Sequence, residues 1–102
     1  MIDLPPIHPG SFLKEELEER GILPSHLAAA LRVPKNRITE ILNERRGISG
    51  DTALRLGHYL GTGERLWMNL QSEYELARAR RRAGGDISAL PRLEADAGGV
   101  AD

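Results

Sequence analysis

The chain of 102 residues has no cysteine, and one Phe, one Trp and two Tyr make only four aromatic residues. The absence of cysteine excludes disulfides, thiolate metal sites and cysteine nucleophiles. Leu, Ile, Ala and Val must therefore supply most of the core. The sequence has no apolar run of about 18 residues, which a transmembrane helix requires, and its first residues, MIDLPPIHPG, lack the charged-then-apolar order of a signal peptide. These absences predict a single small cytoplasmic domain with no membrane contact.

Charge is sorted along the chain although the net charge is only −1. Residues 1–82 carry 13 Lys and Arg against 11 Asp and Glu, a balance of +2. Residues 83–102 carry one Arg against four acidic residues, a balance of −3. Residues 31–46 hold five basic residues and two acidic ones, so a local basic surface can contact phosphates in spite of the overall balance.

The spacing of apolar residues predicts an all-α fold of five helices and no strand. The expected helices span about 10–20, 24–31, 35–43, 50–60 and 63–82. Gly21 and Gly61 suit helix C-termini, and Ser49 and Thr62 suit the N-terminal caps of the fourth and fifth helices. The residues expected to face inward from the fourth helix are Ala53, Leu54, Leu56, Leu60 and, as a further candidate, Tyr59.

Residues 83–102, AGGDISALPRLEADAGGVAD, differ in composition from the rest of the chain. They are rich in Gly, Ala and Asp and poor in large apolar residues, so they cannot bury enough surface to offset the entropy cost of ordering. We therefore expect a helical domain over residues 1–82 and a flexible, disordered acidic tail over residues 83–102. The alternative is a tail that folds on a partner through Ile87, Leu90 and Leu93.

Residues 24–43, PSHLAAALRVPKNRITEILN, are the most informative stretch of the chain. They have the pattern of two short helices joined by a tight turn, with Val33 at the corner and Ala28 where the helices cross. The apolar residues that would face inward are Leu27, Leu31, Ile38 and Ile41. The second helix would then present side chains that can hydrogen-bond base edges or phosphates. These residues are Lys35, Asn36, Arg37 and Thr39.

Further candidate DNA contacts follow this helix. Arg45 and Arg46 could bind the phosphates beside a half-site, and Ser49 lies at a helix N-terminus, where backbone amides favour an anion. For Ser49 the alternative role is simple capping, which is compatible with a phosphate contact. The alternative for the whole group is an ordinary solvated polar surface. Arg55 is expected to form a structural ion pair with Glu40 or Glu44.

The fifth helix carries more apolar residues than the core of a domain this size needs. Trp67 is expected in the core, whereas Leu70, Tyr74 and Leu76 are the candidate dimer interface. The run of Arg78, Arg80, Arg81 and Arg82 suits a solvated helix end, with attraction to an acidic patch as the alternative. We therefore expect a homodimer.

No residue pattern indicates catalysis or a metal. His8, His26 and His58 are scattered without ligand spacing, and no cysteine assists them. No nucleophile, base and orienting group occur together. We expect no catalytic residue, no metal and no cofactor.

Four stretches of the chain resemble the HigA-type antitoxins, a branch of the Cro/C1-type (XRE) helix-turn-helix family. They are HPGSFLKEEL at 8–17, the helix-turn-helix at 24–43, RRGISGDTALRLGHYLGT at 45–62 and LWMNLQSEYELARA at 66–79. The block RGISGDTALRL, followed by a helix with the pattern W-x-NLQ-x-x-Y-x-LA, is the most specific part. Together the stretches cover nearly all of residues 8–79.

The resemblance implies a five-helix, λ-repressor-like domain that dimerises and binds inverted-repeat, double-stranded operator DNA. It also implies an antitoxin that neutralises a RelE-like mRNA-cleaving toxin encoded beside it and represses their shared promoter. One residue departs from the family pattern, because Arg32 stands after the second helix where the family commonly has Gly in a left-handed conformation. A non-glycine residue there costs about 1 kcal/mol, which the charge of Arg32 near phosphate would offset.

Two alternative functions remain open from the sequence. One is a stand-alone helix-turn-helix transcriptional regulator without a toxin partner, which an adjacent reading frame for a small basic ribonuclease-like protein would argue against. The other is a protein-interaction module that has lost DNA binding, which the retention of Lys35, Arg37, Arg45 and Arg46 argues against. For a toxin, the expected contact surface is the N-terminal arm and the acidic first helix, with Glu15, Glu16, Glu18 and Glu19, rather than the tail.

Overall fold

The computed structural model describes residues 5–93, and five helices account for most of them. The helices are α1 (Pro9–Arg20), α2 (Pro24–Leu31), α3 (Lys35–Leu42), α4 (Gly50–Leu60) and α5 (Glu64–Ser88). No strand occurs within this range. The all-α, five-helix prediction is confirmed, and every expected helix boundary except the end of α5 lies within one residue of the observed one.

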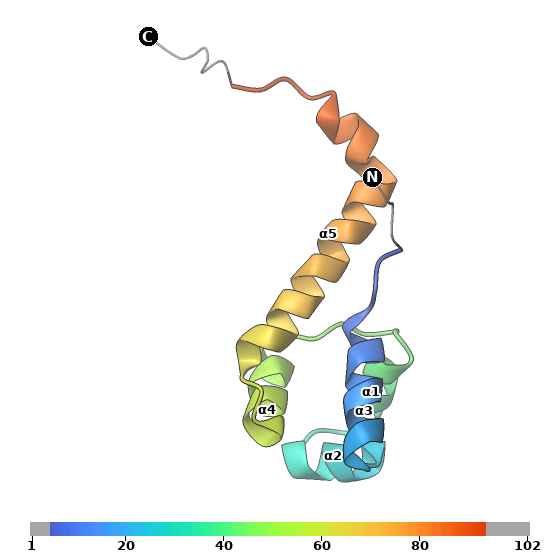
Figure 1. Ribbon diagram of the computed structural model, residues 1–102, viewed down its shortest axis with the longest axis vertical. Helices are drawn as coiled ribbons and strands as arrows, with labels where there is room; N and C mark the ends of the chain where they lie inside the picture. Colours follow the sequence, from blue (N-terminus) through green and yellow to red (C-terminus); the bar gives the residue numbers. More distant parts are fainter. Residues whose placement is uncertain (1–4, 94–102) are drawn as a thin grey trace.

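The first four helices and the start of α5 enclose the core, while the rest of α5 projects from this body (Figure 1). Trp67, the largest fully buried side chain, has no exposed surface and lies in the first turns of α5. The inward residues predicted for the helix-turn-helix, Leu27, Leu31, Ile38 and Ile41, are all buried. Val33 packs partly buried against this core, as its place at the corner between α2 and α3 predicts.

Two close approaches in the fold require glycine. A Cβ atom on Gly10 would overlap the carbonyl oxygen of Ile41, where α1 meets the end of α3. A Cβ atom on Gly57 would overlap the backbone of Gly63, where α4 meets the turn that leads into α5. A larger residue at either position would force apart elements that pack on the shared core.

Three consecutive helices end in the same backbone motif, although glycine follows only the first of them. Gly21, Arg32 and Glu44 have φ angles of 68°, 59° and 63°. Beyond each, an N–H donates to a carbonyl five residues earlier, at 2.8 to 3.0 Å, in the pairs Ile22 to Leu17, Val33 to Ala28 and Arg45 to Glu40. These Schellman motifs satisfy carbonyl groups at the helix ends. The left-handed conformation expected for Arg32 is confirmed.

Two residues expected to face inward from α4 are exposed. Leu54 has 58% of its surface exposed and Tyr59 has 48%. The buried residues of α4 are Thr52, Ala53, Leu56, Gly57 and Leu60. They recur at intervals of three and four residues and so define one helical face, which leaves Leu54 and Tyr59 beside it rather than on it.

Both ends of α5 differ from the expectation. Thr62 does not cap the helix; the capping position is Gly63, and the Thr62 hydroxyl instead accepts the indole N–H of Trp67 at 2.8 Å. The helix continues to Ser88, through residues that the sequence assigned to the tail. Extending an existing helix avoids the cost of nucleation, so these residues stay helical although they bury little surface. Residues 89–93 have no regular structure, and the rest of the expected flexible tail, 94–102, lies outside the described residues.

His8 connects the N-terminal segment to α5, a role that the scattered histidines did not indicate. Its Nδ1 accepts the backbone N–H of Gly10 at 2.8 Å and so caps α1. Its ring also meets Tyr74 edge-on, with 4.8 Å between ring centroids. Burial lowers the pKa of His8 below its ordinary value, and the neutral ring can therefore keep Nδ1 as an acceptor.

Replacing Arg32 with Gly should raise the free energy of unfolding by about 1 kcal/mol, because glycine adopts a left-handed conformation without a Cβ clash. For a domain of this size the melting temperature should rise by about 4–8 °C. Circular dichroism during heating measures the change. The control is Arg32→Ala, which keeps a Cβ and should not raise the melting temperature. An equal rise in both variants would show that the arginine side chain, rather than the left-handed backbone, lowers the stability of the natural protein.

Candidate nucleic-acid interface

The seven predicted DNA-contacting residues come from the start of α3, the loop between α3 and α4, and the N-terminal cap of α4. Lys35 and Asn36 are exposed in the first turn of α3. Thr39 is half-buried on the same helix, and its hydroxyl donates to the carbonyl oxygen of Asn36 at 3.3 Å. Because Asn36 and Thr39 are three residues apart, their side chains lie on neighbouring parts of one helix face.

Arg37 is held by a carboxylate from the next helix. Its Nη1 donates to Oδ2 of Asp51 at 2.9 Å, which joins the first turn of α3 to the first turn of α4. The Arg37 side chain is only 28% exposed, whereas that of Asp51 is 56% exposed. The hydrogen bond from Arg55 and, to a smaller extent, that from Arg37 lower the pKa of Asp51 below its ordinary value.

Arg55 forms the expected structural ion pair with a different partner. The sequence suggested Glu40 or Glu44, but the Nε of Arg55 donates to Asp51, four residues earlier on α4, at 2.9 Å. A helix brings residues four apart together, and this local pair prevails over the more distant ones. Arg55 also donates from Nη1 to the carbonyl oxygen of Leu31 at 2.8 Å, at the end of α2.

The loop after α3 places Arg45 and Arg46 at the surface, and both are exposed. The Nε of Arg46 donates to Oε1 of Glu40 on α3 at 2.8 Å. Ser49 caps α4, since its hydroxyl accepts the N–H of Thr52 at 3.3 Å. The capping role proposed for Ser49 is therefore confirmed, whereas its phosphate contact stays a prediction.

Gln71 fixes this loop, and the sequence did not single it out. Its Oε1 accepts the N–H of Ile48 at 2.8 Å, and its Nε2 donates to Glu75 at 2.7 Å. Gln71 is buried, four residues after Trp67 on the same face of α5. The sequence did contain a signal for this role: Gln71 is a polar residue on an otherwise apolar helix face, and a buried amide needs hydrogen-bond partners.

The three candidate dimer residues occupy different environments. Leu70 packs partly buried against the core. Tyr74 lies between the ring of His8 and the guanidinium of Arg78, which is 5.4 Å from the Tyr74 ring centroid. Leu76 is 48% exposed. Leu70 and Tyr74 line a groove of about 680 Å³ between the N-terminal segment, α1 and α5.

Two further features bear on what the molecule can bind. Among residues 5–93, no helix is long and apolar enough to cross a bilayer. In the same part of the chain, no three His, Asp or Glu side chains are placed to hold a metal ion.

Comparison with known proteins finds relatives in both sequence and structure. No protein-family model matches the chain. It is similar to virulence-associated protein I of Dichelobacter nodosus, with 46% identity over 80 residues, which are 78% of this chain and 74% of the relative. It is also similar to the Pseudomonas aeruginosa antitoxin HigA solved with the higBA promoter, with 48% identity and a TM-score of 0.82 over 86% of this chain and 98% of that one.

A further solved structure is an addiction module antidote protein of the HigA family from Coxiella burnetii. The similarity has a TM-score of 0.82 and 41% identity, and it covers 87% of this chain and all of the Coxiella chain, 100%. This identity over most of both chains and the TM-scores together show a shared fold. The chain therefore belongs to the HigA family of helix-turn-helix antitoxins.

Proposed function

We propose that this protein is the antitoxin of a two-component module and works in the cytoplasm as a homodimer. It represses its own operon by binding palindromic operator DNA, and it neutralises a RelE-like, mRNA-cleaving toxin. The observation that carries the DNA part is the exposed first turn of α3, with Lys35 and Asn36, beside the arginines of the following loop. Operator binding is also supported by the P. aeruginosa relative, which was solved with the higBA promoter.

In this proposal α3 enters the major groove by its N-terminal end, as recognition helices do. Asn36 can pair with adenine N6 and N7, and Arg37 can pair with guanine O6 and N7. Lys35 and Thr39 contact bases or the adjacent backbone. Arg45, Arg46 and Ser49 bind phosphates and set the register of the protein on the duplex.

The dimer part of the proposal rests on the projecting half of α5. Of the expected interface residues Leu70, Tyr74 and Leu76, Leu76 is 48% exposed. Ile87 near the end of α5 and Leu90 just beyond it are 56% and 61% exposed and extend this apolar surface. A helix that extends beyond the body of a small domain (Figure 1) and carries exposed apolar side chains has surface to bury against a second copy. Two recognition helices would then lie about 34–36 Å apart, one turn of DNA.

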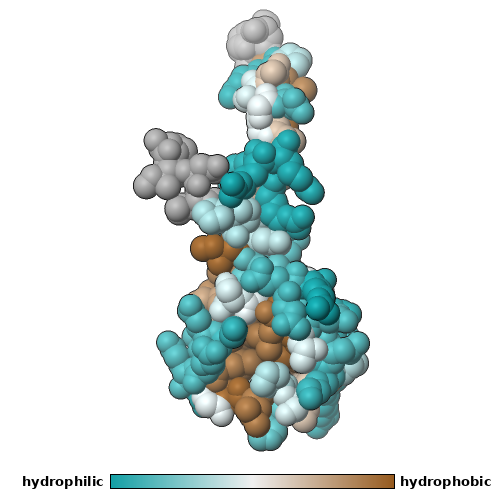
Figure 2. Space-filling view, turned by 90° about the vertical axis from the view of Figure 1, so that its right-hand side faces the viewer, coloured by the Kyte–Doolittle hydropathy of each residue, from teal (hydrophilic) through white to brown (hydrophobic). Residues whose placement is uncertain are grey.

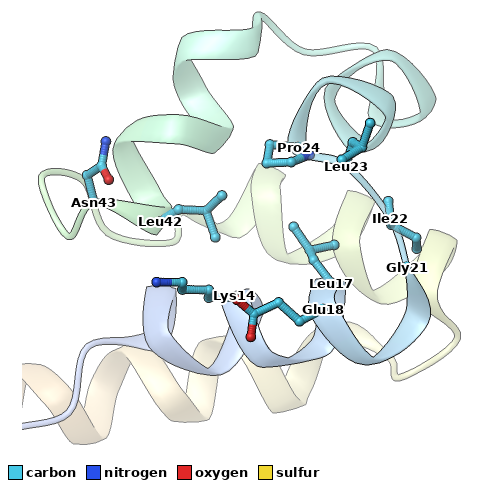
Figure 3. A pocket seen from close by; sticks show the side chains of 9 residues that line it. All are labelled: Lys14, Leu17, Glu18, Gly21, Ile22, Leu23, Pro24, Leu42 and Asn43. Atoms are coloured by element: carbon cyan, nitrogen blue, oxygen red, sulfur yellow. The ribbon is translucent and has the colours of Figure 1, made fainter.

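The toxin part of the proposal concerns α1 and the groove next to it. Glu15, Glu18 and Glu19 are exposed on α1, whereas Glu16 is paired with Arg20 at 3.1 Å. In Figure 2, apolar residues form a patch on the side of the helical body that faces the viewer. A groove of about 450 Å³ lies between α1, the start of α2 and the end of α3, where Leu17 and Leu42 point toward one another (Figure 3). An enzyme that cleaves RNA needs a basic surface near its substrate. The acidic residues of α1 would attract such a basic surface, and the apolar groove would provide surface to bury in the complex.

Arg37→Ala should weaken binding to the operator by roughly 1–3 kcal/mol, the contribution of one bidentate contact to guanine. A gel-shift titration with the upstream region of the gene and a scrambled duplex measures this. Arg65→Ala, a charge loss at the start of α5, is the matched control and should leave operator affinity nearly unchanged. Equal affinity of the unaltered protein for both duplexes would refute sequence-specific binding.

Sedimentation at micromolar concentration should show a dimer, and Leu76→Glu should shift it toward monomer, because the change places a charge in the proposed α5 interface. Leu54→Glu makes the same change at a residue that is 58% exposed on α4 and should leave the dimer intact. A monomer in the unaltered protein, with operator binding retained, would mean that dimerisation occurs only on DNA.

Reversing Glu15 and Glu19 to Lys should weaken toxin binding at least tenfold, since the expected partner surface is basic. The control reverses Glu64 and Asp86 on α5, an equal change of charge at exposed positions away from α1. A second variant ends after Leu93, which keeps α5 whole and removes only the terminal residues. Pull-down and calorimetry with the toxin measure the effects. Loss of binding in the shortened chain but not in the α1 variant would identify the tail as the inhibitor.

A further inference from the structure

Two hydrogen-bonded side chains, Asp51 and Arg55, join three helices beside the proposed DNA-binding surface. Oδ2 of Asp51 accepts both Nη1 of Arg37 and Nε of Arg55, each at 2.9 Å. Arg55 donates in addition to the carbonyl oxygen of Leu31, the last residue of α2, at 2.8 Å. Asp51 therefore links the first turns of α3 and α4, and Arg55 extends this network to the end of α2.

This network fixes the direction of the Arg37 side chain before any DNA is bound. An unrestrained arginine samples many rotamers and loses that freedom on binding. Asp51 engages Nη1 of Arg37, and within residues 5–93 no other hydrogen bond to this side chain is found. The edge formed by Nε and Nη2 therefore remains for two parallel hydrogen bonds to O6 and N7 of a guanine.

Asp51 also places a negative charge at the surface. Its side chain is 56% exposed, next to the cap of α4 that is proposed to meet a phosphate. A carboxylate in this place repels the phosphates of every sequence alike. Only a duplex that offers a base contact to the oriented Arg37 can offset this repulsion.

We infer that Asp51 is a specificity-determining residue of the operator site and acts through Arg37. It orients the Arg37 guanidinium for one base contact, and it weakens the binding of DNA with an unrelated sequence. The inference rests on the proposed operator binding. Asp51 is a positioning residue in this scheme, because it acts through Arg37 and needs no contact with a base.

A second ion pair on the same surface supplies a matched control. Glu40 accepts Nε of Arg46 at 2.8 Å, and the two side chains are 36% and 46% exposed. This pair joins the loop to α3 and has no third partner among the described residues. Since Arg46 is proposed to contact phosphate, removing the charge of Glu40 should strengthen binding to every duplex by the same factor.

The experiment measures binding of the full chain to its upstream region and to a scrambled duplex of the same composition, at several salt concentrations. For Asp51→Asn we expect severalfold tighter binding to the scrambled duplex, and a steeper salt dependence by about one phosphate contact. The ratio of the affinity for the upstream region to the affinity for the scrambled duplex should fall roughly tenfold, within the range of discrimination that one bidentate contact supplies. Glu40→Gln should tighten binding to both duplexes and leave the ratio unchanged.

Two further variants separate geometry from charge. Asp51→Glu keeps the charge but lengthens the side chain, so the ratio should fall without tighter binding to the scrambled duplex. In an Arg37→Ala background, Asp51→Asn should cause no further fall in the ratio. Melting temperatures, compared by circular dichroism, establish that the variants are folded.

An unchanged ratio in Asp51→Asn, with both duplexes bound more tightly, would overturn the inference and leave Asp51 as a source of charge only. If Asp51→Asn lowers the ratio equally in the Arg37→Ala background, Asp51 does not act through Arg37. In both cases the unaltered protein still distinguishes the two duplexes, and the proposed operator binding stands. If the unaltered protein fails to distinguish them, the proposed operator binding is refuted and this inference with it.

Discussion

The arrangement of the whole domain depends on how the first turns of α5 are fixed, and Trp67 fixes them. The Trp67 side chain has no exposed surface, and its ring meets Phe12 of α1 edge-on, with 5.5 Å between centroids. A buried indole N–H without a partner would cost about 1–3 kcal/mol, and the hydroxyl of Thr62 accepts it. The contact between Phe12 and Trp67 therefore joins α1 to α5 within the core.

This anchored helix also positions the proposed DNA-binding surface. One turn after Trp67, Gln71 accepts the N–H of Ile48 and holds the loop that carries Arg45 and Arg46. The same helix then continues as the projecting segment proposed for dimerisation. A single rigid element therefore determines where the loop lies within a protomer and how far apart two protomers would hold their recognition helices.

Apolar periodicity was enough to predict the five helices and the buried residues of the helix-turn-helix, because burial on one face imposes its spacing on the sequence. The partner of Arg55 was predicted wrongly, although Asp51 lies four residues away on the same helix and offers the simplest local pair. The length of α5 was underestimated because residues 83–88 were judged as an independent segment rather than as the continuation of a helix. Gln71 was missed since its role depends on a loop that only the fold brings near.

The chain has a net charge of −1, and its candidate DNA-binding surface carries acidic residues among the basic ones. Asp51 and Glu40 pair with Arg37, Arg55 and Arg46, and the side chains of these pairs are 28–56% exposed. Exposed pairs add little to stability, typically about 0–1 kcal/mol each, so stability does not account for them. In the proposed scheme their main effect is on binding: a phosphate must compete with Glu40 for Arg46, whereas a base edge can use the groups of Arg37 that Asp51 leaves open. In this scheme the acidic residues lower the affinity for every duplex, and only a duplex with the base contact for Arg37 offsets that loss.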